Sequence, residues 1–326
     1  MSFVREYPLK AKSMSTVMFE KITIIGLGLI GSSLARVIKR KDLTQKLVAA
    51  DTSESVCTKV RELGLADVVT PDITKSVIGS DLVILAVPVG AVRAVIEQIA
   101  PLLMPGAVLT DVCSVKSAVI EAAAPFLPES ADLVPAHPIA GTEHSGPESG
   151  LVDLFDGRWC ILTPPPETSI KAVEKVTKFW EACGAQIEIM DAAHHDLVLG
   201  ITSHLPHLIA YTIVDTADQL EDDLKAEVIK YSASGFQGFT RIAASDPIMW
   251  RDIFMNNKEA VLEILQRFTE DLTAMQKAIR RGDGSYLQET FIRTRAIRRE
   301  IIEMGAKVLP NPSLVSLEVP KKQDSE

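Results

Sequence analysis

The sequence has few cysteines, no excess of positive charge and no long apolar run. Its 4 cysteines, Cys57, Cys113, Cys160 and Cys183, lie far apart and form no CxxC pair, which argues against a zinc ribbon and a secreted disulfide framework. No segment reaches the roughly 18 uninterrupted apolar residues of a membrane span, and residues 1–20 hold no run of signal-peptide length. We therefore expect a cytoplasmic protein without a membrane span.

Acidic residues outnumber basic ones, 43 against 34, which gives a net charge of -9. Such a chain repels nucleic acid and anionic membrane surfaces on average, so neither is an expected partner. An acidic small substrate would need a local basic pocket. The 326 residues, 47% of them hydrophobic, are typical of a globular protein with about two domains of ~150 residues.

The first half of the chain alternates short apolar runs with helical stretches, the pattern of βαβ units around a parallel sheet. Strands are expected as ITIIG (22–26), KLVAAD (46–51), DLVILAVP (81–88), AVLTDV (107–112), ADLVPAH (131–137) and WCILTP (159–164). A helix over 169–184 and a strand over 185–191 are expected to complete the same sheet. Strands this apolar indicate helices on both sheet faces.

From Ala193 to Ala306 the apolar period changes to 3.6 residues, as at Val261 and Ile264, so this half is expected to be all-helical. Breaks are expected at Gly235, Gly238, the Asp246 and Pro247 start signal, and 282–284. The helical half has more apolar helix faces than one bundle of its size needs, which indicates a homodimer. The tail from Pro310 to Glu326 is rich in proline and charge and is expected to be unpacked.

The sequence GLGLIG at 26–31 follows an expected strand and opens an expected helix, the context of a dinucleotide-binding loop. Gly26 would make the tight turn, Gly28 would let the backbone approach a pyrophosphate, and Gly31 would allow close helix packing. The amides at Leu29 and Ile30 begin the helix whose N-terminus favours phosphate. In isolation, the motif is equally typical of an ordinary glycine turn.

Asp51 strengthens the nucleotide interpretation, because it ends the second strand 20 residues after Gly31, where an acid accepts hydrogen bonds from the adenosine ribose. Its alternative role is a helix N-cap, and both roles are compatible. A carboxylate there repels a 2'-phosphate, so NAD is favoured over NADP. Val87 and Pro88 end the strand expected over 81–88 and are expected beside the nicotinamide ribose, although a strand-ending proline is also an ordinary feature.

Histidine is the usual base for oxidation of an alcohol by a nicotinamide cofactor. His137 lies at the carboxyl end of an expected strand, the edge where open α/β sheets bind ligands. His204 and His207 are three residues apart and share a helix face, and Pro206 between them is expected to kink that helix.

Several segments together resemble the prephenate and arogenate dehydrogenases of tyrosine biosynthesis. They are GLGLIG (26–31), DVCSVK (111–116), HPIAGTEHSG (137–146), SHLPH (203–207) and FTRIAASDPIMWRDI (239–253). The resemblance implies a doubly wound α/β Rossmann domain followed by an all-α dimerisation domain. We accordingly expect an N-terminal extension (1–20), a Rossmann NAD-binding domain (21–191), a helical substrate and dimerisation domain (192–307) and a tail (308–326).

By this resemblance, His137 is the catalytic base for the C4 hydroxyl of the substrate, and Ser114 nearby orients it. Four further residues are implied at the substrate: His207 and Arg241 facing its carboxylates, and Glu143 and Trp250 shaping the pocket. An arginine fork suits a carboxylate. Taken singly, Arg241 is typical of a surface charge, Trp250 of a core and Ser114 of a helix N-cap.

The remaining histidines and the cysteine beside Ser114 are expected to have supporting roles. His204 is expected to cap or pack in its helix, His144 to be a second polar group near the site, and His194 and His195 to face solvent. Cys113 has no activating base in the sequence and is expected to be structural.

The implied reaction passes hydride from C4 of prephenate or arogenate to NAD+, while His137 takes the hydroxyl proton and loss of CO2 makes the ring aromatic. No metal is expected, because no cluster of ligands has metal-binding spacing. The sequence leaves open whether the substrate is prephenate or arogenate. We expect no ACT-type domain after the helical half and no chorismate mutase domain before Lys21, so tyrosine would inhibit only at the active site.

Two alternatives remain open at this stage. Rossmann dehydrogenases of the β-hydroxyacid or 6-phosphogluconate type resemble the first 90 residues, but they use a lysine on a helix of the second domain and fit HPIAGTEHSG and SHLPH poorly. A non-catalytic NAD-binding regulator would need the glycines and Asp51 but not the His, Ser and Arg set.

Overall fold

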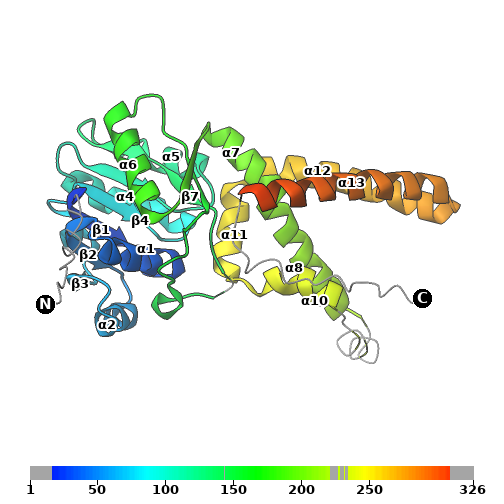
Figure 1. The fold of residues 1–326 in the computed structure, drawn as a ribbon, viewed down its shortest axis with the longest axis horizontal. Helices are drawn as coiled ribbons and strands as arrows, with labels where there is room; N and C mark the ends of the chain where they lie inside the picture. Colours follow the sequence, from blue (N-terminus) through cyan, green and yellow to red (C-terminus); the bar gives the residue numbers. More distant parts are fainter. Residues whose placement is uncertain (1–16, 143, 221–226, 228–230, 232–233, 309–326) are drawn as a thin grey trace, which may run out of the picture. The chain divides into compact units, whose positions relative to one another are not determined.

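The computed structural model describes residues 17–142, 144–220, 227, 231 and 234–308 (Figure 1). The chain divides into two compact units, one up to Ile264 and one from Leu265 onward. The expected N-terminal extension lies mostly outside the described residues, as does nearly all of the expected tail.

A parallel six-stranded sheet with the order β3-β2-β1-β4-β5-β6 forms the centre of the first unit. The strands are β1 (Phe19–Ile25), β2 (Thr44–Ala50), β3 (Val68–Thr70), β4 (Leu82–Leu85), β5 (Val108–Asp111) and β6 (Asp132–Val134). The connecting segments are α1 (Leu29–Arg40), α2 (Glu54–Glu62), α3 (Ile73–Val77), η1 (Val89–Ala91), α4 (Val92–Ile99), η2 (Ala100–Leu102) and α5 (Ser117–Ala123). The expected doubly wound α/β fold is confirmed.

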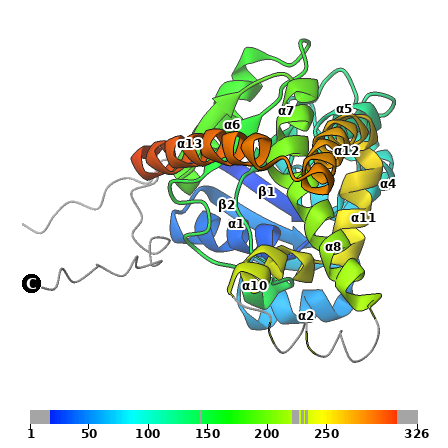
Figure 2. The same ribbon diagram turned by 90° about the vertical axis from the view of Figure 1, so that its right-hand side faces the viewer.

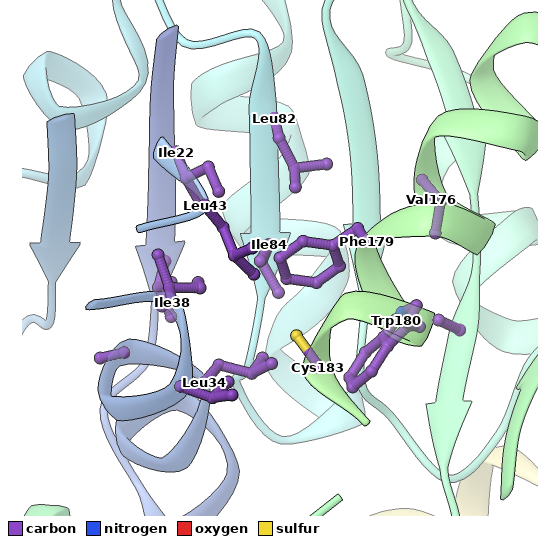
Figure 3. Close-up of a cluster of buried hydrophobic side chains, with 14 of the residues drawn as sticks. Ile22, Leu34, Ile38, Leu43, Leu82, Ile84, Val176, Phe179, Trp180 and Cys183 are labelled. Atoms are coloured by element: carbon purple, nitrogen blue, oxygen red, sulfur yellow. The ribbon is translucent and has the colours of Figure 1, made fainter. Parts of the chain in front are cut away.

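Two buried apolar clusters cover the two faces of this sheet, because the strands are apolar on both sides. On one face, Leu34 of α1 and Phe179 of α6 (Ile170–Cys183) pack over Ile22 and Ile84 of the central strands (Figure 3). On the other face lie α4, α5 and Trp250 from the helical half. The N-cap Ser169 and the left-handed Gly184 bound α6, as the sequence predicts.

A second sheet corrects three strand predictions. The expected strand over 131–137 is two strands, β6 and β7 (Ala136–Pro138), which separate at Pro135 and belong to different sheets. Proline has no N–H for a ladder and its fixed φ favours a break there. β7 pairs antiparallel with β8 (Trp159–Leu162), which pairs parallel with β9 (Gln186–Ile189). The strands expected at 159–164 and 185–191 therefore do not extend the main sheet.

One helical rod follows this sheet, made of α7 (Ala192–Leu199), a π-helical turn η4 (Gly200–His204) and α8 (Leu205–Asp218) (Figures 1 and 2). Pro206 lies in the first turn of α8, and the π turn before it is the local irregularity that a proline inside a helix favours. By length and apolar composition alone, this rod could cross a membrane. That is weak evidence, because its buried face carries polar residues bonded to other elements, as described below.

The remaining described elements are η3 (Pro147–Ser149), α10 (Ser234–Thr240), η5 (Arg241–Ala244), α11 (Pro247–Asn256), α12 (Lys258–Arg281) and α13 (Gly284–Val308). Asp246 caps α11 and Pro247 is its first residue, as predicted. The break at 282–284 is also confirmed, with Gly282 at φ 68°. The breaks expected at Gly235 and Gly238 are wrong, since both glycines lie within α10.

Candidate active site

The glycine loop between β1 and α1 fits a dinucleotide by its packing. Gly26 has φ 96°, and a Cβ on it would lie 2.4 Å from the Ala86 carbonyl oxygen. A Cβ on Gly31 would lie 2.0 Å from the Gly26 oxygen, whereas one on Gly28 would meet no atom within 4 Å. Two glycines are thus required by close packing, and Gly28 leaves the backbone open to a ligand. Within the described chain, no side chain caps α1, so the first-turn amides at Leu29 and Ile30 face this opening.

Asp51 lies directly beside the glycine loop. Its carboxylate accepts hydrogen bonds from the Leu27 amide at 3.0 Å and the Ser53 amide at 2.9 Å. The N-cap of α2 is Ser53, whose side chain accepts from Val56, so the alternative role of Asp51 as N-cap is not seen. The arrangement leaves the carboxylate close to where the loop would hold a nucleotide.

A continuous set of contacts leads from the glycine loop toward His137. β4 ends at Leu85, so Val87 and Pro88 follow the strand rather than end it. Val87 Cγ1 would lie 3.0 Å from a Cβ on Gly26, and the Val87 carbonyl accepts from the Cys113 thiol at 3.5 Å. Asp111 makes the next link, because its carboxylate accepts from the Cys113 amide at 2.8 Å and pairs with the Lys116 ammonium. That ammonium also donates to the Ala136 carbonyl at 2.7 Å. The carboxyl ends of β1, β4 and β5 and strand β7 therefore form one region.

His137 is buried in β7, and its closest polar partner is another histidine. The distance from His137 Nδ1 to His195 Nε2 is 2.8 Å, and His195 Nδ1 lies 2.8 Å from Asp196 Oδ1. His195 has no exposed surface, so the expectation that it faces solvent is wrong, whereas His194 is exposed as expected. α7 begins one turn earlier at its Asp191 cap, which turns His195 and Leu199, four residues apart, toward the interior.

Asp196 also binds the start of α5. Its carboxylate accepts from the Lys116 amide at 2.8 Å and the Ser117 amide at 2.9 Å. These are free amides of a helix N-terminus, which a carboxylate stabilises. The alternative role of Ser114 as N-cap is therefore wrong, because α5 begins at Ser117 and Asp196 binds its N-terminus; Ser114 is half-buried in the preceding loop.

The buried environment lowers the pKa of both bonded histidines. Burial, helped by His195 and Lys116, holds the pKa of His137 well below the ordinary histidine value. Burial also lowers the pKa of His195, although Asp196 acts in the opposite direction. Burial acts to raise the pKa of Asp196, but hydrogen bonds from His195 and the α5 amides outweigh it and lower that pKa. The set at neutral pH is thus two neutral histidines and one carboxylate.

Cys113 is buried, and burial raises the pKa of its thiol well above the ordinary value, so a thiolate is disfavoured. This agrees with the structural role that the sequence predicts.

His204 is buried as well, and its ring nitrogen Nδ1 accepts from the side-chain amide of Asn257 at 3.0 Å. Burial lowers the pKa of His204 to about 4, and the residue packs in its helix rather than capping it.

His207 stacks on Trp250, with ring centroids 3.6 Å apart and planes 22° apart. His207 Nδ1 donates to the Ser203 carbonyl at 2.8 Å, which leaves its Nε2 as an acceptor in the neutral ring. Burial and the nearby Arg241 charge both lower the pKa of His207. The structure thus brings His207, Arg241 and Trp250 together, and Trp250 is also part of an apolar cluster.

Glu143 lies outside the described residues, and His144 is exposed.

Three residues of this site were not predicted as site residues from the sequence: His195, Asp196 and Lys116. Lys116 belongs to the DVCSVK segment, whose serine alone was assigned a role. For His195 the spacing gave no signal, because His194 and His195 each precede an apolar residue, Val198 and Leu199, by four positions.

Comparison with known families agrees with this geometry. A family model described as the nucleotide-binding domain of prephenate dehydrogenase matches residues 34–189, and one described as its dimerization domain matches residues 191–293. The chain belongs to the prephenate dehydrogenase family. Because both halves match this one family, the β-hydroxyacid dehydrogenase and regulator alternatives are not favoured.

Individual relatives show the same likeness. Cyclohexadienyl dehydrogenase of Zymomonas mobilis is 43% identical over 84% of this chain and 93% of its own. Prephenate dehydrogenase of Bacillus subtilis is 31% identical over 84% of this chain and 74% of its own. A crystal structure of prephenate dehydrogenase from A. aeolicus with hydroxyphenyl propionate and NAD+ has a TM-score of 0.80 and 35% identity, and the match covers 90% of this chain and 100% of that one.

Proposed function

We propose that the protein catalyses the NAD-dependent oxidative decarboxylation of prephenate, arogenate or both, to 4-hydroxyphenylpyruvate or tyrosine. The observation that carries the proposal is the continuous path of contacts from the glycine loop to the strand of His137, which runs through Val87, Cys113, Asp111 and Lys116. It brings a nucleotide-binding loop and a buried base to one edge of the sheet, in a chain of this family.

His137 is the base in this proposal. Its lowered pKa keeps the ring neutral at neutral pH, and only the neutral ring can take up the C4 hydroxyl proton. Bound NAD+ supplies the hydride acceptor. Loss of hydride from C4 and of CO2 from C1 makes the ring aromatic, which drives the reaction in one direction. Ser114, on the loop after β5, orients the substrate hydroxyl beside His137.

The substrate carboxylates are bound at the second cluster. Arg241 would form the charged contact, His207 would donate or accept beside it, and Trp250 holds the His207 ring by stacking. Glu143 is proposed to complete the pocket. In a protein with a net charge of -9, a local cation is needed to attract a dicarboxylate.

We propose that NAD is held by the glycine loop and the residues beside it, which are Gly26, Gly28, Leu29, Ile30, Gly31, Asp51, Val87 and Pro88.

We further propose a cytoplasmic homodimer formed mainly through the helical half. The proposed domain limits are 21–191 and 192–307. Tyrosine, which shares the ring and one carboxylate of the product, would inhibit by occupying the active site.

The direct test is NADH formation, followed by absorbance, when the full chain is incubated with NAD+ and either prephenate or arogenate. The proposal expects turnover with at least one substrate, and side-by-side kcat/KM values decide the preference. Absence of NADH with both substrates, in protein that binds NAD+ by calorimetry, would instead support a non-catalytic NAD-binding protein.

A further inference from the structure

Three buried side chains form a line that ends at His137. Asp196 Oδ1 lies 2.8 Å from His195 Nδ1, and His195 Nε2 lies 2.8 Å from His137 Nδ1. The two imidazole planes are inclined by 64°. All three residues are buried, so these hydrogen bonds do not compete with bulk water.

The positions of the protons follow from the donors and acceptors in this line. An ionised carboxylate only accepts, so Nδ1 of His195 must carry a proton and donate it to Asp196. In neutral His195 the other nitrogen, Nε2, is then a bare acceptor. The partner atom, His137 Nδ1, must therefore carry a proton and donate it. Neutral His137 is left with its lone pair on Nε2.

The opposite arrangement would block the base. If His195 carried its proton on Nε2, it would donate to His137 Nδ1, and the neutral His137 ring would hold its proton on Nε2. That atom could not then accept a hydroxyl proton. A neutral imidazole holds one proton, so the arrangement at His195 decides which nitrogen of His137 is basic.

Asp196 is itself held in place from three directions. Its carboxylate accepts from the amides of Lys116 and Ser117, and its main-chain carbonyl accepts from Asn257 at 2.8 Å. The other charged or titratable groups that act on His137 and His195 are Lys116, Asp111 and His204. Lys116 and Asp111 are paired with each other, which leaves Asp196 as the carboxylate that determines the proton position in this line.

We propose that Asp196 and His195 are positioning residues that hold neutral His137 with its proton on Nδ1 and its Nε2 free as the base. During the reaction, the hydroxyl proton of the substrate bonds to His137 Nε2, while the Nδ1 proton stays hydrogen-bonded to His195. The resulting imidazolium charge is balanced through His195 by the Asp196 carboxylate. The identity of His137 as base rests on the proposed function, but its tautomer does not.

The first test measures that tautomer without any turnover. Nitrogen-15 NMR of protein labelled at histidine distinguishes a protonated from a bare ring nitrogen, and the His137 signals are those lost in His137→Gln. We expect Nδ1 protonated and Nε2 bare at neutral pH. An Nε2-protonated ring, or a mixture of the two tautomers, would overturn the proposal.

The second test uses a pair of variants at His195. His195→Gln keeps a side-chain oxygen that can accept from His137 Nδ1, whereas His195→Leu keeps none. In His195→Leu we expect the population of the Nδ1 tautomer of His137 to decrease and kcat to fall about tenfold or more. The KM values for prephenate and arogenate should change less than about twofold. His195→Gln should recover kcat to within about threefold of the original, since it restores the acceptor.

The exposed neighbour provides a matched control, because His194→Leu removes an imidazole from the same helix turn and should change neither kcat nor the His137 signals. If His195→Leu leaves the tautomer unchanged, His195 does not set it and the inference is wrong. If the original protein shows the Nδ1 tautomer but oxidises neither substrate, the proposed function fails and the tautomer assignment stands. If the protein oxidises a substrate but His137 carries its proton on Nε2, the proposed function stands and the tautomer assignment fails.

Discussion

Lys116 and Asp111 form an ion pair in which neither side chain has any exposed surface. The same two residues bind both main-chain polar groups of Ala136, the residue before His137: the ammonium binds its carbonyl at 2.7 Å, and the carboxylate binds its amide at 3.2 Å. The pair therefore fixes the strand that carries the proposed base.

We expect Lys116→Met to lower the free energy of unfolding by about 3–5 kcal/mol, because it leaves the Asp111 charge buried without its partner. The double variant Lys116→Met with Asp111→Asn should lose less, because no unpaired charge remains. Urea unfolding followed by circular dichroism measures both values. A loss below about 1 kcal/mol in the single variant would mean that the pair is not buried in solution.

Asp51→Ser is expected to raise the use of NADP+ relative to NAD+. The carboxylate repels a 2'-phosphate, and like charges at close range cost several kcal/mol, so the ratio of the two kcat/KM values should shift by about tenfold or more. A preference for NADP+ in the original protein would show that Asp51 has another role.

His137→Asn is expected to lower kcat by about 10²-fold or more, since asparagine cannot take up a proton, while substrate binding changes far less. In the original protein, kcat/KM should rise with pH as His137 becomes neutral. The pKa of His137 is lowered by burial, so this rise should be complete below the ordinary histidine pKa, and activity should be lost only on further acidification. If the variant keeps both kcat and this profile, His207 is the next candidate for the base.

Arg241→Gln is expected to raise KM for the substrate by about ten- to a hundredfold, the effect of losing a hydrogen bond to a charged group. The effect on kcat should be smaller. Arg251 is a suitable control, because it is also an exposed arginine and pairs with Asp252. Equal changes in KM in Arg241→Gln and Arg251→Gln would indicate a general charge effect rather than a carboxylate contact.

The homodimer prediction rests on large apolar side chains that are exposed in each unit. In the first unit they include Ile213, Val214, Met255 and Leu262, and in the second Leu272, Phe291 and Ile301. Light scattering at micromolar concentration should return about twice the chain mass of 35.5 kDa. A mass of one chain would show that these surfaces are not buried against a second copy.

Local rules were sufficient where a few neighbouring residues determine the geometry. Gly26 was predictable because its tight turn has a positive φ, and Gly31 because a Cβ there would collide with the Gly26 carbonyl five residues earlier. Asp246 and Pro247 were predictable for the same kind of reason, since a helix start depends on its own first turn. The apolar strands around 22–26 and 81–88 indicated the parallel sheet, because only buried strands are apolar on both faces.

The sequence by itself determined the doubly wound domain, the glycine loop and the position of His137 near a strand end. Only the tertiary structure decided that Pro135 separates two sheets, that His195 rather than His194 turns inward, and that Asp196 binds α5. These depend on hydrogen bonds between residues as far apart as Lys116 and Asp196. A period of 2 or 3.6 residues carries no information about such distant partners, and burial selects among them only when the chain has folded.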